Sequence, residues 1–131
     1  MNEHGSMLPF MAALIFVALV VIGLALDVAL LGATYREAAF AADIGAEAGA
    51  GELAFDSYGN EVRLDPARAE LAAVDAALSA RPRVERTAVA TADQTTVCVT
   101  VTDRYHPRIL SAIGVGPEVI TVDACAEPRR G

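Results

Sequence analysis

The chain has 131 residues, and its 17 acidic side chains outnumber its ten basic ones, all arginine, to give a net charge of −7. This length allows one membrane segment and at most one small domain. The charges are scattered and form no basic cluster, which argues against binding to nucleic acid or to anionic lipid surfaces.

The N-terminal part predicts a membrane span. From Met7 to Leu26 there are 20 residues without a charge. A helix of that length covers roughly 30 Å, the thickness of a bilayer's hydrocarbon core. We therefore predict a head at residues 1–6 and a transmembrane helix over residues 7–31. A cleaved secretory signal fits less well, because the head lacks Lys and Arg and the apolar run is too long.

Asp27 is the first charged residue after the apolar run. An acid within a membrane helix is a candidate functional residue. At the end of the run, however, its carboxylate is expected to reach the lipid headgroups, so we interpret Asp27 as the membrane boundary. Positive charge weakly favours the C-terminal part inside, since Arg36 alone follows the span closely and no Lys or Arg precedes it, but one arginine does not decide the orientation.

Residues 32–50 are expected to continue the helix, because they contain no proline and are rich in alanine. Small residues gather on one face of this extension. Such a face lets another helix approach closely, although an exposed alanine-rich helix without a partner is the alternative. The residues predicted to take part in helix packing are Ala38, Ala41, Ala42, Gly45 and Gly49.

Residues 51–131 are predicted to begin with a turn at Gly59-Asn60, followed by an amphipathic helix. Asp65 is a suitable N-cap with Pro66 after it, and Pro82 ends the helix. We expect this helix to lie on a sheet through an apolar stripe of Leu71, Val74 and Leu78.

Three β-branched segments that alternate with period two predict strands at residues 86–92, 95–102 and 118–126. A tight turn is expected at Asp93-Gln94 and a short helix over residues 107–113, ended by Gly114. The fold class is therefore α+β: a long N-terminal helix, then a small domain of one amphipathic helix, three strands and a short helix.

Cys98 and Cys125 are the only cysteines. If the second and third strands pair antiparallel with these two residues opposite each other, the polar residues fall on one face and the apolar residues on the other. A disulfide is then expected, which places the domain outside the cytoplasm. Two half-buried thiols and a parallel crossover are the alternatives.

The sequence favours a structural role over catalysis. It contains no nucleophile elbow, phosphate loop, zinc helix or dinucleotide fingerprint, so we expect neither an enzyme nor a cofactor. A metal site built from the cysteines and His106 is not supported, because no ligand pair has the usual spacing.

Several segments resemble Tad/Flp pilus proteins of the TadE and TadG type. They are the Gly5-Ser6 step before the apolar run, "AADIGAEAGA", "EVRLDPARA", and the tail "TTVCVTVT…GVGPEVITVDACAEP". The resemblance implies a minor pseudopilin or a membrane-anchored assembly protein, and a prepilin peptidase that cuts between Gly5 and Ser6. Processed members usually carry a glutamate where this chain has Phe10, so an uncut anchor stays open beside a cut pseudopilin.

The expected protein thus crosses the cytoplasmic membrane once, with its N-terminus inside, its domain (residues 51–131) outside, and incorporation into a pilus open. Its expected partners are the membrane, other pilin-like subunits or Tad assembly-platform proteins, and the prepilin peptidase, without nucleic acid. The alternative function is a membrane-tethered binding or adaptor module unrelated to pili.

Overall fold

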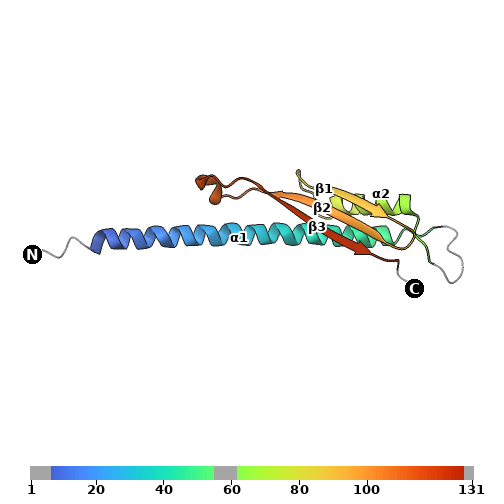
Figure 1. Ribbon diagram of the computed structural model, residues 1–131, viewed down its shortest axis with the longest axis horizontal. Helices are drawn as coiled ribbons and strands as arrows, with labels where there is room; N and C mark the ends of the chain where they lie inside the picture. Colours follow the sequence, from blue (N-terminus) through green and yellow to red (C-terminus); the bar gives the residue numbers. More distant parts are fainter. Residues whose placement is uncertain (1–6, 55–61, 129–131) are drawn as a thin grey trace, which may run out of the picture.

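The computed structural model describes residues 7–54 and 62–128, which form a two-layer α+β fold with one very long helix (Figure 1). The expected turn at Gly59-Asn60 lies outside the described residues. The elements in chain order are α1 (Met7–Ala50), α2 (Pro66–Ser79), β1 (Thr87–Ala92), β2 (Val97–Tyr105), the 3-10 helix η2 (Leu110–Ile113) and β3 (Glu118–Ala126).

Helix α1 has two halves with different surroundings. Its first part, before Gly23, extends beyond the rest of the chain, and its large apolar side chains are exposed (Figure 1). Its C-terminal half lies in the core, where Ala38, Ala41, Ala42 and Ala46 are buried with residues of α2 and β2. The core therefore takes residues from both the 32–50 and the 51–131 segment.

The three strands form an antiparallel sheet in the order β1-β2-β3, so the parallel crossover does not occur. In β2 and β3, Cys98 lies opposite Cys125 and Thr100 opposite Asp123. This register is the one that sorts polar from apolar residues. Val97, Val99 and Val101 of β2 are fully buried and face the helices.

Helix α2 begins as predicted, since the Asp65 side chain accepts a hydrogen bond from the Arg68 N–H. The expected buried stripe is wrong, however. Leu71 is 75% exposed. The face that packs against α1 and the sheet instead consists of alanines, because only small side chains let two helices approach this closely. The buried residues are Ala69, Ala73 and Ala77.

A buried ion pair joins the segment before β1 to β2. The Arg86 guanidinium donates to both carboxylate oxygens of Asp103, with a shortest N–O distance of 2.6 Å, and to the Arg81 carbonyl. Both side chains of the pair are almost completely buried. The bidentate hydrogen bonds offset part of the desolvation cost of the two charges and join the residue just before β1 to β2.

Candidate functional site

Asp27 connects α1 to the loop between β2 and β3. Its carboxylate accepts hydrogen bonds from the backbone N–H groups of Arg108 (3.0 Å), Ile109 (3.0 Å) and Leu110 (2.7 Å). The Tyr105 hydroxyl donates to a carboxylate oxygen and to the Asp27 carbonyl, both at 3.1 Å. The side chain is therefore satisfied within the chain.

This arrangement corrects the expected environment of Asp27. The sequence suggested that its carboxylate extends to the lipid headgroups, but the residue is only 2% exposed. The physical reason lies in η2, which has no capping side chain of its own at Ile109. Because the first N–H groups of a helical turn need acceptors, a carboxylate from α1 supplies them.

Tyr105 ends β2 and points its hydroxyl at α1. Burial of the phenol raises its pKa, and the neighbouring Asp27 carboxylate raises it further. The hydroxyl therefore stays protonated and acts as a donor to the carboxylate near neutral pH.

Gly23 lies one helical turn before Asp27, on the same buried face of α1. A Cβ at this position would lie 2.8 Å from Cγ2 of Ile109, so the loop approaches the helix backbone more closely than a side chain there would allow. Gly23 allows the loop to pack closely on α1, and Asp27 holds it there through hydrogen bonds. Sequence reasoning identified Asp27 but missed its partners; the only local sign was a short helix without a capping residue.

The small residues predicted to pack against a helix are all buried. The helix that covers them is α2 of the same chain: a Cβ at Gly45 would lie 2.7 Å from the Ala73 carbonyl oxygen, and one at Gly49 would lie 2.8 Å from that of Ala69. The predicted contact of this face with a helix is therefore made within the chain. The small-residue face is occupied within the chain.

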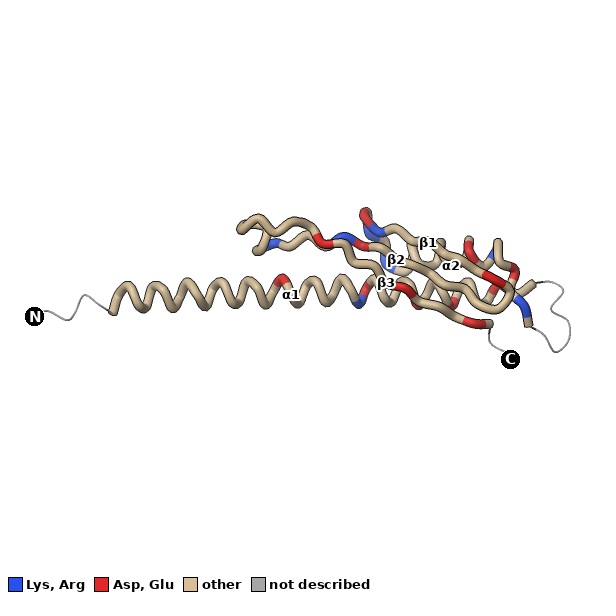
Figure 2. Tube along the Cα trace, viewed as in Figure 1, with Lys and Arg blue, Asp and Glu red and all other residues tan. Residues whose placement is uncertain are grey.

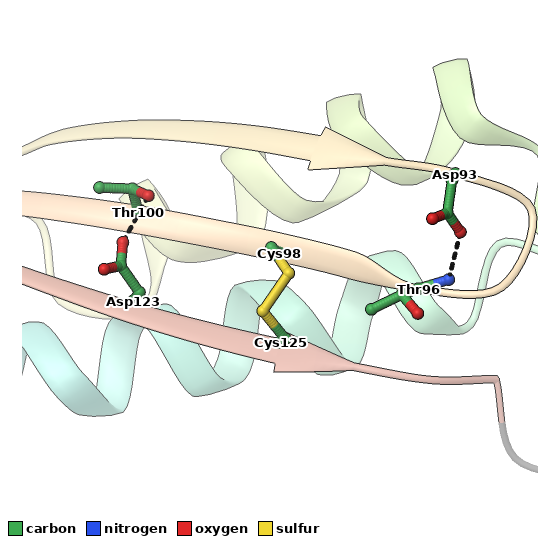
Figure 3. The surroundings of a disulfide bond; sticks show 6 residues. All are labelled: Asp93, Thr96, Cys98, Thr100, Asp123 and Cys125. Atoms are coloured by element: carbon green, nitrogen blue, oxygen red, sulfur yellow. Dashed lines mark hydrogen bonds between the residues drawn. A yellow bond between two sulfur atoms is a disulfide. The ribbon is translucent and has the colours of Figure 1, made fainter.

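The two cysteines form a disulfide between β2 and β3. It lies on the face of the sheet opposite the buried valines, near the hydrogen bond from Thr100 to Asp123 (2.6 Å) (Figure 3). Cys125 is exposed and Cys98 half-buried, so reagents in solution can reach the bond.

The Gly5-Ser6 junction lies outside the described residues. His106 is an exposed loop residue whose Nε2 lies 2.7 Å from a carboxylate oxygen of Glu85. Over residues 7–54 and 62–128, no group of three or more His, Cys, Asp or Glu side chains is arranged to hold a metal ion.

Comparison with protein-family models, with curated proteins and with solved structures finds no match to this chain.

Proposed function

We propose that this chain is a membrane-anchored, pilin-like assembly component of a Tad/Flp-type pilus or secretion system. The observation that carries the proposal is the division of α1. One continuous helix of 44 residues presents exposed apolar side chains along its N-terminal half and forms the spine of a small domain with its C-terminal half.

The apolar half of α1 needs a non-aqueous environment. Its large side chains, among them Leu14 and Phe16, are close to half exposed or more, and the helix is long and apolar enough to cross a membrane. Soluble monomers rarely expose contiguous apolar surface of this extent. A bilayer, or other apolar helices within an assembly, would cover it. Because the small-residue face is already occupied by α2, contacts with other subunits would use this apolar half.

The domain fits a position outside the cytoplasm. Its disulfide joins two strands of a small domain, and disulfides persist in oxidising compartments. With the domain outside, the N-terminus of α1 would lie at the cytoplasmic side, within reach of a prepilin peptidase. The role proposed is one of packing and protein contact rather than catalysis.

The proposal is tested in the native host by deleting the gene and counting surface pili by electron microscopy. We expect pili to be lost, and to return with the wild-type chain or with Val84→Arg, a change at a fully exposed position outside the helix. Leu14→Arg should fail to restore them, since an arginine within the span disfavours insertion by about 2.5–3.5 kcal/mol. Normal piliation of the deletion strain would overturn the proposal.

The intact mass of the protein from its native membrane separates the two forms of this proposal. Loss of residues 1–5 only when the prepilin peptidase is present would make the chain a cleaved pseudopilin despite Phe10. Full length in both strains would make it an uncleaved anchor, as in TadG-like proteins.

A further inference from the structure

We propose that the β2–β3 loop, residues 106–117, inserts its apolar tip into the bilayer leaflet nearest the domain. The tip is defined by Ile109, Leu110, Ile113 and Val115. This inference rests on the proposed membrane anchoring by α1 and adds a second membrane contact that the helix alone does not predict.

The position of the loop along α1 is the first observation that supports this insertion. Ile109 packs on Gly23, and Gly23 lies three residues inside the uncharged run that ends at Leu26. At 1.5 Å per residue, this places the contact about 5 Å inside the hydrocarbon boundary. Figure 2 shows the loop extending beside α1, past the acidic position within the helix and toward the N-terminus.

The composition of the loop is the second observation that supports this insertion. In a chain with a net charge of −7, residues 106–117 contain no acid, and Arg108 is their only Lys or Arg. Ile113 is 77% exposed, and Ile109 and Val115 are each more than 40% exposed. Covering three exposed aliphatic side chains on one short loop with an apolar phase lowers the free energy of the system. The contact would thus be apolar and would not require anionic lipid.

Many backbone N–H groups of the loop are already hydrogen-bonded, as an apolar environment requires. An unpaired N–H in hydrocarbon costs several kcal/mol. The N–H groups of residues 108–110 are bonded to Asp27, and those of Ala112, Gly114 and Val115 to carbonyls within the loop. The Ser111 hydroxyl donates to the Arg108 carbonyl. The carboxylate that holds the loop against α1 thus also satisfies three of the loop's backbone N–H groups.

The chain contains no tryptophan, so a single introduced tryptophan reports its own depth. Three full-length variants would be reconstituted in vesicles of zwitterionic phosphatidylcholine carrying quenchers at a shallow or a deep acyl position. Ile113→Trp tests the tip, Phe16→Trp tests the span, and Val84→Trp is the exposed control outside both. All three positions are exposed in the fold, so the larger side chain can be accommodated.

We expect Ile113→Trp to emit at shorter wavelength than Val84→Trp and to lose most of its intensity to the shallow quencher. Phe16→Trp should respond more to the deep quencher. If Phe16→Trp is quenched while Ile113→Trp behaves like Val84→Trp, the loop inference fails and the anchor stands. If Phe16→Trp is not quenched, the anchor itself fails. A blue-shifted but unquenched Ile113→Trp would show that protein, such as a second copy, covers the tip, and would also overturn the inference.

Discussion

The Asp27 carboxylate accepts three hydrogen bonds from the β2–β3 loop and one from Tyr105 at the end of β2, about 80 residues further along the chain. Asp27→Asn would keep the shape of the side chain but replace one acceptor oxygen with an NH₂ group that faces N–H donors. We expect faster hydrogen exchange at residues 108–110, measured by mass spectrometry on the full-length chain in detergent. Asp43→Asn, at an exposed position of the same helix, should leave this exchange unchanged. Equal protection in both variants would show that Asp27 does not hold the loop.

The Arg86–Asp103 pair makes a different prediction at the scale of single residues. Asp103→Ala leaves a buried guanidinium without its carboxylate, which should cost about 3–5 kcal/mol in the free energy of unfolding. Combining Arg86→Met with Asp103→Leu should restore much of that loss, since a packed apolar pair has no charge to desolvate. Urea unfolding of the full-length chain in detergent measures both. A single variant as stable as wild type would contradict the account.

The hydrogen bonds of Asp93 predict a pH-dependent contribution of this residue to the stability of the fold. Hydrogen bonds from the Thr95 N–H, the Thr95 hydroxyl and the Thr96 N–H lower the pKa of Asp93. A lowered folded pKa means that the stabilisation is complete above the unfolded pKa of about 3.9 and is lost as the pH falls through the folded pKa. The Tm difference between wild type and Asp93→Ala should therefore be constant at neutral pH and shrink in acid. Asp75→Ala, an exposed carboxylate on α2, is the matched control.

At the scale of elements, the contact between α1 and α2 depends on glycines. A Cβ at Gly45 would meet the Ala73 carbonyl oxygen and the Ala77 side chain, whereas one at Gly32, on the same helix, would meet nothing within 4 Å. Overpacking costs about 1–3 kcal/mol. Alanine in place of glycine within a helix gains about 1 kcal/mol. Gly45→Ala should thus lower the Tm of the full-length chain in detergent, and Gly32→Ala should keep or raise it. The opposite order would show that the two helices are not in close contact.

The sequence predicted the elements well where local chemistry decides them. The two cysteines, together with the alternation of polar and apolar residues, indicated the β2–β3 register, and Asp65 with Pro66 indicated the start of α2. The buried face of α2 was not predictable in the same way. Gly45 and Gly49 lie at the contact on α1, so close approach selects alanines on α2 and leaves Leu71 in solvent. The partners of Asp27 were hidden for a similar reason, since backbone N–H donors carry no sequence signature.

At the scale of the whole molecule, α1 is one continuous helix that joins an exposed apolar segment to a folded domain. The buried face of α1 runs from Gly23 to Gly49, so the domain is attached along more than half of the helix. A domain held in this way cannot tilt freely on its anchor. The β2–β3 loop therefore lies beside the uncharged apolar run of α1 (Figure 1). The face of the sheet that bears the disulfide points away from the helices (Figure 3).

The central claim is that α1 tethers a disulfide-stapled domain on the outer side of the membrane. The most direct measurement is thiol labelling with an impermeant maleimide in intact spheroplasts, with and without an impermeant phosphine reductant. Because Cys98 and Cys125 are the only cysteines and are joined, we expect no labelling before reduction and two labels per chain after it. Labelling without reduction, or labelling that appears only after the membrane is lysed, would contradict the account.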